Sequence, residues 1–449
     1  MLTLIKNGYL IDPASGREGL YDILIDGEFI RRVEERIEEE LVREEAEMAE
    51  QVLTVIDADH RYVMPGFIDL HVHLREPGFE YKETIASGTM AAAAGGFTTI
   101  CPMPNTKPVT DSAAMIQLII SKAQQEAAVN VLPVGAITVG QAGSELVSIS
   151  ELKSAGAVAI SEDGKSVMNS ALYMEAMRQA AYDQMPIFAH CEDKELVGKG
   201  VINAGSKAKK LGLAGISNAV EDTITARDIL MAKESGAQLH LCHISTRDSA
   251  RMLGLAKEEG LPVTGEVCPH HFTLSDEDIP GDDSDYKMNP PLRRREDVQA
   301  LKEALKNGVI DVISTDHAPH SVEEKAKSMA EAPFGIVGSE TAFALVLTEL
   351  VEAGYLTLSQ MVEKLSVNPA KILRSNRGCI DIGRVADLVI ADPKAEYCID
   401  KEGFYSKGRN TPFHGRKVRG RVEMTFVAGK RVYFYGKNTG CETEHGIPK

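Results

Sequence analysis

The sequence predicts an α/β fold: a (β/α)8 barrel of the TIM type with a small β-sandwich domain built from both ends of the chain. Three observations support this prediction. Between residues 63 and 375, eight short apolar stretches alternate with Ala- and Leu-rich stretches of helical character. Parallel strands joined by helical crossovers have this pattern, and eight of them close a barrel. Strand-and-turn segments precede and follow that region, and 449 residues are enough for both parts.

Each apolar stretch is the length of one buried strand. The third crossover, over residues 139–156, has the weakest helical signal because it contains Gly140 and Gly143. The other crossovers read as ordinary helices. The eight expected strands are 63–73, 97–105, 130–138, 157–164, 186–193, 238–245, 262–271 and 309–320.

The two ends of the chain resemble each other more than they resemble the barrel region. We therefore expect residues 63–375 to form the catalytic barrel domain, and residues 1–62 with 376–449 to form one composite β domain. Residues 31–50 are strongly acidic, and their apolar residues Val33, Ile37 and Leu41 recur every four positions. This spacing predicts a surface helix or a partly ordered insertion.

Composition and charge narrow the class of protein. The chain is 43% hydrophobic and 26% charged, which is ordinary for a globular protein, and its net charge of −17 argues against nucleic acid or an anionic membrane as partner. No apolar run could span a bilayer, and the N-terminus lacks the pattern of a signal peptide. Seven scattered cysteines do not suggest a disulfide framework, so we expect a cytoplasmic protein.

Polar residues with metal-ligand chemistry collect where the expected strands end. His71 and His73 are two residues apart, so they lie on one face of a strand, and neutral imidazole is a common zinc ligand. Later strands end in Glu162-Asp163, His190, His243 and Asp316. Because barrel enzymes carry their sites at the carboxyl ends of the strands, the pattern predicts a metal centre at that rim.

Seven motifs identify a family resemblance. PGFIDLHVHLREPG and GGFTTICPMPNT lie within residues 63–109, and AHCED, CHIST, CPHH, MNPPLR and STDHAPH follow. In this order they closely resemble dihydroorotases of the amidohydrolase superfamily, over essentially the whole chain. The His-x-His motif alone indicates only the superfamily, whereas Arg75 and MNPPLR narrow the resemblance to dihydroorotases.

The resemblance implies a binuclear zinc centre, in which cobalt or manganese could substitute. One zinc would be held by His71, His73 and Asp316, and the other by His190 and His243.

A further anionic group would bridge the two metals. Many relatives use a carbamylated lysine, whereas this chain resembles the bacterial branch that uses an aspartate, here Asp163. A carbamylated Lys165 is the competing assignment. Glu162 is expected to support the centre from behind or to be solvated.

The implied reaction is the reversible cyclisation of N-carbamoyl-L-aspartate to L-dihydroorotate and water in de novo pyrimidine biosynthesis. A hydroxide shared by two metals would attack the ring amide, because zinc lowers the pKa of bound water from about 15.7 to about 7. Asp316 would act as general acid and base, moving the proton between water and the ring nitrogen.

Substrate binding requires a cation for the free carboxylate. Arg75 offers a planar fork that matches it, and the resemblance adds partners for the carboxylate and the ring. The segment 321–339 is either a mobile lid or an ordinary surface loop. The expected substrate-binding residues are His73, Arg75, Asn105, Asn289, His320, Phe334 and Gly335.

Other reactive residues are expected to be structural. His270 and His271 on strand seven are interpreted as packing or supporting groups, because the ligand set is complete without them, and His317 is interpreted as structural. The cysteines beside the motifs (Cys101, Cys191, Cys242 and Cys268) are interpreted as small buried thiols. No function is assigned to His60, His240, His414 or His445.

Two rival functions remain. A hydantoinase or allantoinase would share the metal centre without needing Arg75, and a metal-less scaffold would lack some of the ligands, none of which is missing here. At family level we expect a homodimer, with association with aspartate carbamoyltransferase as a further possibility.

Overall fold

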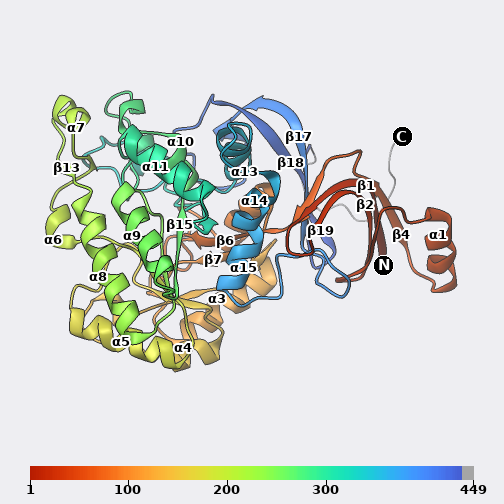
Figure 1. Cartoon of the computed structure of the whole chain (residues 1–449), viewed down its shortest axis with the longest axis horizontal. Helices are drawn as coiled ribbons and strands as arrows, with labels where there is room; N and C mark the ends of the chain where they lie inside the picture. Colours follow the sequence, from red (N-terminus) through yellow and green to blue (C-terminus); the bar gives the residue numbers. More distant parts are fainter. Residues whose placement is uncertain (437–449) are drawn as a thin grey trace.

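The computed structural model describes residues 1–436, and all eight expected barrel strands are present in it (Figure 1). Strands β6 to β8 form one parallel sheet, and β9, β10, β11, β14, β15 and β16 form another in that order. Pro133 separates β8 from β9 because proline has no N–H for the ladder, and a parallel bridge between Val72 and His317 joins the two ends. The strands are β6 (Phe67–Val72), β7 (Phe97–Pro102), β8 (Asn130–Val131), β9 (Val134–Ala136), β10 (Ala159–Ser161), β11 (Ile187–Ala189), β14 (Leu239–Leu241), β15 (Val263–Val267) and β16 (Val312–Ile313).

Helices follow the strands as crossovers. Several begin at a side-chain cap; Thr84, for example, accepts a hydrogen bond from Ser87 N at the start of α2. The third crossover helix, α4, has only seven residues, in agreement with its weak helical signal. The crossover helices are α2 (Ile85–Ala94), α3 (Ala113–Glu126), α4 (Ile149–Ala155), α5 (Ser170–Tyr182), α8 (Ala219–Ser235), α9 (Arg247–Glu258), α11 (Arg295–Lys306), α13 (Ala342–Val346), α14 (Leu358–Val362) and α15 (Asn368–Ile372).

The barrel interior is filled by apolar side chains, as a packed core requires. Ile68, Leu70 and Phe188 are fully buried there, and Ile372 of α15 belongs to the same cluster. The polar side chains described below lie at the carboxyl ends of the same strands. Short elements between β11 and α8 complete this region: α6 (Lys194–Val197), β12 (Ile202–Asn203), α7 (Ser206–Leu211) and β13 (Gly215–Ile216).

The two ends of the chain share one eight-stranded sheet, in which the red and blue strands of Figure 1 lie side by side. The strand order is β19-β18-β17-β5-β1-β2-β3, with β4 paired to β1. A bridge between Phe29 and Val385 brings β3 back toward β17, so the sheet curls around its own apolar core. Its strands are β1 (Leu2–Asp12), β2 (Arg17–Asp26), β3 (Phe29–Glu34), β4 (Leu53–Asp57), β5 (Tyr62–Pro65), β17 (Leu388–Cys398), β18 (Lys417–Val427) and β19 (Lys430–Phe434).

In the acidic segment 31–50, the helix is shorter than predicted and buries a different face. Its first residues continue β3, and helix α1 covers only Glu39–Met48. Val42 and Ala46 face the sheet, whereas Leu41 is 54% exposed. The four-residue spacing correctly predicted a helix in this segment. It predicted the wrong apolar face, because it was counted from Val33, which belongs to strand β3.

Two expected strands are each divided in the structure. The stretch 63–73 contributes β5 to the composite sheet and β6 to the barrel. The stretch 262–271 ends as a strand at Val267, and a short helix, α10 (Pro269–Thr273), follows. Proline at the first helical position favours this change, so His270 and His271 lie on a helix rather than on strand seven.

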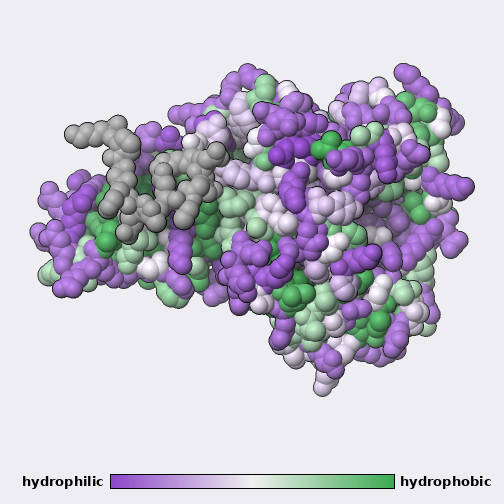
Figure 2. Space-filling model, turned by 180° about the vertical axis from the view of Figure 1, so that it is seen from behind, coloured by the Kyte–Doolittle hydropathy of each residue, from purple (hydrophilic) through white to green (hydrophobic). Residues whose placement is uncertain are grey.

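The molecular surface is mainly polar. Hydrophilic side chains cover most of the face in Figure 2, with smaller apolar areas between them. Within residues 1–436, no helix is long and apolar enough to cross a membrane. The six cysteines of this part of the chain are free thiols, whereas His445 and the end of the 376–449 segment lie outside the described residues.

Candidate metal centre

His71 in β6 and His73 just after it lie close to two carboxylates from distant strands. His71 Nε2 lies 3.1 Å from Asp163 Oδ1, and His73 Nε2 lies 3.0 Å from Asp316 Oδ1. Each histidine is also 3.6 Å from the other carboxylate. These four side chains are at most 10% exposed. The structure therefore brings together residues separated by more than 240 positions, as sequence analysis predicted for the rim.

The remaining two histidines approach the same oxygen of Asp163 that faces His71. His190 Nδ1 is 3.5 Å and His243 Nε2 is 3.9 Å from Asp163 Oδ1, and the two nitrogens are 2.9 Å apart. The Asp163 carboxylate thus lies within 3.9 Å of all four imidazoles, close enough to be a ligand shared by two metals. Two neutral imidazole nitrogens this close need a proton or a cation between them.

A metal fits this donor set. His71 Nε2 is buried and makes no hydrogen bond among the described residues, although it faces the Asp163 carboxylate. Burial lowers the pKa of His190, but hydrogen bonding to Asp163 and Glu192 outweighs it and raises that pKa to about 10. For His71, burial is likewise outweighed by the Asp163 charge, and the pKa is well above its ordinary value. A field that holds protons this strongly also attracts metal cations.

Hydrogen bonds to the Nδ1 atoms of His71 and His73 fix the orientation of their rings. His71 Nδ1 lies 3.1 Å from Glu266 Oε1, and His73 Nδ1 lies 2.9 Å from the Asn105 side-chain oxygen. Because both acceptors require the proton on Nδ1, each histidine would offer an Nε2 lone pair to a metal that takes the place of the proton on Nε2. Asn105 also donates to Asp163 Oδ2 at 3.1 Å.

Lys165, the competing candidate for the bridging ligand, does not reach the metal centre. Lys165 is exposed, and its ammonium donates to the Gln141 carbonyl at 2.9 Å. Glu162 is buried, and its carboxylate accepts hydrogen bonds from the backbone N–H groups of Ile137 and Thr138 rather than facing the histidines. The geometry favours Asp163.

Three residues at the rim have left-handed backbone conformations. The φ angles are 60° at Arg75, 35° at His243 and 47° at Asp316. A non-glycine residue in this region carries a cost of about 1–3 kcal/mol, and such strain concentrates at functional sites. In each case the unusual turn occurs where the chain leaves a barrel strand.

A cavity of about 170 Å³ adjoins the centre. Arg75 lies in its wall and donates through Nε to the Pro319 carbonyl at 3.2 Å. His320 does not line the cavity: its Nε2 donates to the Phe334 carbonyl at 2.7 Å, and it lies behind Arg75. The other expected substrate residues do line it, namely His73, Asn105, Asn289, Phe334 and Gly335.

The segment 321–339 is anchored to the barrel from behind. It begins with the short helix α12 (Val322–Lys325), and the buried Lys325 ammonium donates to the carbonyls of Pro333 and Gly335 at 3.3 and 3.0 Å. Asn410 also donates to Gly335 O at 2.9 Å. These bonds fix the backbone that lines the cavity, so the structure favours an anchored loop over a mobile lid.

Comparison with known proteins identifies the family. A family model described as "Dihydro-orotase-like" matches residues 60–249. The dihydroorotase of Anoxybacillus flavithermus is 52% identical over 383 residues, which cover 85% of this chain and 90% of the relative. That of Caldanaerobacter subterraneus is 46% identical over 96% of this chain and 97% of its own. The chain belongs to the dihydroorotase family.

Solved structures give the same fold. The L-hydantoinase (dihydropyrimidinase) of Arthrobacter aurescens superimposes with a TM-score of 0.84 at 26% identity, covering 97% of this chain and 96% of its own. The D-hydantoinase of a Thermus species gives a TM-score of 0.81 at 28% identity. The predicted fold class, a TIM-type barrel with a β-sandwich, is confirmed.

In this dihydroorotase-family chain, Glu266 and His240 support the metal centre although no sequence motif pointed to them. Glu266 is fully buried and also lies 3.1 Å from His240 Nε2, while His240 Nδ1 faces Thr264 Oγ1 at 2.8 Å. Burial raises the pKa of Glu266, but the hydrogen bonds with His240 and His71 outweigh it and hold the pKa low. An isolated glutamate within the apolar stretch of β15 was the available signal.

His317 has the structural position that sequence analysis proposed. Its Nδ1 accepts hydrogen bonds from Gly338 N and Ser339 N at 3.3 and 3.4 Å, and its Nε2 lies 3.4 Å from Glu83. It therefore braces the turn beside Asp316 without facing the metal centre. The cysteines beside the motifs are buried, and burial raises the pKa of Cys191 and Cys242.

Proposed function

We propose that this protein is a metal-dependent dihydroorotase that interconverts N-carbamoyl-L-aspartate and L-dihydroorotate in pyrimidine biosynthesis. The observation that carries the proposal is the position of Arg75, whose guanidinium lies in the wall of the cavity that also contains Asp163 and Asp316. A carboxylate-binding group and a centre for opening an amide thus share one small space. That combination fits a cyclic amide that bears a free carboxylate.

The centre would hold two divalent cations, with zinc as the expected ion and cobalt or manganese as substitutes. His71, His73 and Asp316 would bind one ion, His190 and His243 the other, and Asp163 both. When bound, these ions would acidify water and polarise the ring carbonyl. The nitrogen and oxygen donors of this set suit such borderline cations.

Asp316 would move the proton in both directions. Burial raises its pKa, but the hydrogen bond with His73 and the nearby histidine charges outweigh burial and keep the pKa low. The carboxylate is therefore ionised and can act as a base, taking a proton from the attacking water and delivering it to the leaving ring nitrogen. By microscopic reversibility, the same residue would serve ring closure.

Arg75 would bind the substrate carboxylate. Its Nε is committed to Pro319 O, whereas Nη1 has no acceptor among the described residues. The nearby His320 nitrogen donates its own proton to Phe334 O, so it offers Nη2 no lone pair. The outer edge of the guanidinium is therefore available for a bidentate contact. Asn289 and the backbone of 334–335 would contact the ring.

Steady-state turnover tests this assignment. Enzyme reconstituted with zinc should convert dihydroorotate and carbamoyl aspartate and should leave hydantoin and allantoin almost untouched. Arg75→Gln should raise KM for dihydroorotate by about 10–100-fold, because a charged hydrogen bond contributes about 1.5–3 kcal/mol. Faster turnover of hydantoin than of dihydroorotate by the wild type would overturn the proposal.

Hydantoin hydrolysis is the second candidate, because the superimposed solved structures include hydantoinases. An uncharged ring would give Arg75 no partner. In that case Arg75→Gln should leave hydantoin turnover unchanged, so the same variant discriminates between the two functions.

We further propose a cytoplasmic homodimer that can associate with aspartate carbamoyltransferase. Exposed apolar side chains on α8 and α9, including Leu230 at 66% and Leu255 at 50% exposure, support self-association. The shared sheet of β1–β5 and β17–β19 supports a division into a barrel domain (63–375) and a composite domain (1–62 with 376–449). Light scattering, alone and with the transcarbamoylase, would test the assembly.

A further inference from the structure

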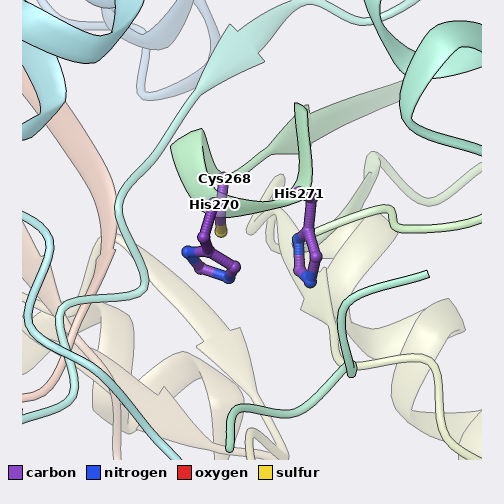
Figure 3. A group of neighbouring side chains, drawn as sticks. All are labelled: Cys268, His270 and His271. Carbon is purple, nitrogen blue, oxygen red and sulfur yellow. The ribbon is translucent and has the colours of Figure 1, made fainter. Parts of the chain in front are cut away.

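A second group of metal-ligating side chains follows β15, separate from the ligand set described above. Cys268, His270 and His271 point to the same side of the turn into α10 (Figure 3). One ligand atom from each lies within 4.8 Å of the others, and all three residues are at most 2% exposed. One nitrogen of each histidine is also shielded from solvent.

The protonation state of His271 follows from its hydrogen bond. Its Nε2 lies 2.9 Å from the Pro290 carbonyl, which can only accept, so Nε2 carries the proton. Nδ1 is therefore a lone-pair nitrogen, and no hydrogen-bond donor reaches it within residues 1–436. Leaving such an atom buried and unpaired costs about 1–3 kcal/mol.

His270 adds a second unpartnered nitrogen. Its Nε2 is also buried without a hydrogen-bond partner in the described chain, and its ring centre lies 4.2 Å from that of His271. The thiol of Cys268 has one proton and could satisfy at most one of the two nitrogens. A cation would satisfy both nitrogens and the sulfur together.

The charges around this group select the kind of cation. The three ligands include no carboxylate, in contrast to the group around Asp163. Burial lowers the pKa of His270 to about 4 and that of His271 well below its ordinary value, so both are neutral ligands. Burial raises the pKa of Cys268, so only a strongly sulfur-binding ion would displace the thiol proton, which would pass to solvent.

We propose that Cys268, His270 and His271 form a binding site for a thiophilic d10 cation, Cu+ or Zn2+. One thiolate and two imidazoles neutralise Cu+ completely, whereas Zn2+ leaves one positive charge buried. Soft thiolate ligands favour Cu+, and only the more distant carboxylates of Asp316 and Glu266 would balance the second charge of Zn2+. The bound ion would hold the first turn of α10 against the end of β15.

Metal titration tests the site independently of dihydroorotate turnover. Protein with its Asp163 centre filled with zinc is titrated anaerobically with Cu+ in competition with bicinchoninate, and it is also expressed in copper- or zinc-supplemented medium and analysed for metal content. One additional equivalent per chain is expected. In a parallel arm, Co2+ replaces Zn2+, and a thiolate-to-cobalt charge-transfer band reports sulfur ligation.

Matched cysteine variants locate the sulfur. Cys268→Ser should lower Cu+ affinity by about 100-fold or more and remove the cobalt band. Cys242→Ser is the control, because Cys242 is also buried but lies beside His71 and Glu266; it should keep both signals. His271→Gln should weaken binding while retaining the thiol.

If a variant fails to fold, X-ray absorption of the wild type still tests the site. It should show one sulfur and two nitrogen neighbours around copper. Three outcomes would overturn the proposal: no extra equivalent in the wild type, no sulfur signal, or loss of the signal in Cys242→Ser instead of Cys268→Ser. None of them bears on the dihydroorotase assignment, which is measured by turnover.

Discussion

Two buried groups of histidines in this protein have similar exposure but different neighbours. The histidines around Asp163 lie among four carboxylates, those of Asp163, Asp316, Glu192 and Glu266. His270 and His271 have a thiol and a backbone carbonyl instead. Burial lowers the pKa of His270 although the charge of Asp316 opposes it, whereas closer anions reverse the effect of burial at His71 and His190. The surrounding charge, more than the imidazole, therefore decides which cation each group attracts.

The strongest test of this contrast removes an anion from the Asp163 group. Asp316→Asn should lower kcat for dihydroorotate by about 10²–10⁴-fold, because the amide cannot accept and deliver the proton. Circular dichroism should show an unchanged fold, and part of the metal should remain bound. Asp311→Asn is the matched control, because Asp311 precedes β16 and pairs with Lys257. Near-wild-type turnover of Asp316→Asn would remove this residue from the mechanism.

A smaller effect is expected from the anion behind His71. Glu266→Gln should weaken zinc binding by about 10–100-fold, because an amide orients and polarises the imidazole less strongly than a carboxylate. Competition with a chromophoric chelator measures this affinity directly. Glu162→Gln should leave it unchanged, since that buried carboxylate binds backbone N–H groups. Equal losses in both variants would indicate a general effect of buried charge.

The pH dependence of stability should have opposite signs in the two groups. In metal-free protein the pKa of His270, about 4, is below its unfolded value of 6.5. Between pH 6.5 and 4 the unfolded chain therefore binds the extra proton, and the unfolding free energy falls as pH falls, by up to about 1.4 kcal/mol per pH unit. His270→Gln should flatten this slope in denaturant titrations.

His190 provides the opposite case for the same measurement. Because its pKa is about 10, its contribution to the unfolding free energy is fully present below pH 6.5 and is lost as pH rises toward 10. His190→Gln should therefore destabilise the metal-free protein most at neutral and acidic pH. Parallel slopes in the two variants would contradict the assignment of opposite charge environments.

The smallest effect is expected at Lys165. Because its ammonium is exposed and binds Gln141 O, Lys165→Ala should change kcat/KM by no more than about 2-fold, equivalent to about 0.5 kcal/mol. Metal content should stay the same with and without added bicarbonate. Loss of one metal, with rescue by bicarbonate in the wild type only, would favour a carbamylated lysine as the bridge.

The sequence by itself determined the barrel, the two-ended sheet and the residues that meet at the rim. Strand and helix periodicities are local properties, and parallel strands necessarily bring their carboxyl ends together. The position of His71 and His73 on one face follows from their spacing alone. The grouping of Asp163, His190, His243 and Asp316 with them follows from the order of the strands.

Only the tertiary structure decided the details that depend on distant neighbours. Pro269 turns His270 and His271 onto a helix, and the fold then leaves one buried nitrogen of each without a partner among the described residues. Glu266 faces His71 across 195 positions, and His320 turns to the Phe334 carbonyl instead of into the cavity. A sequence pattern places a side chain on a face, but its partner is set by packing between elements that are far apart in the chain.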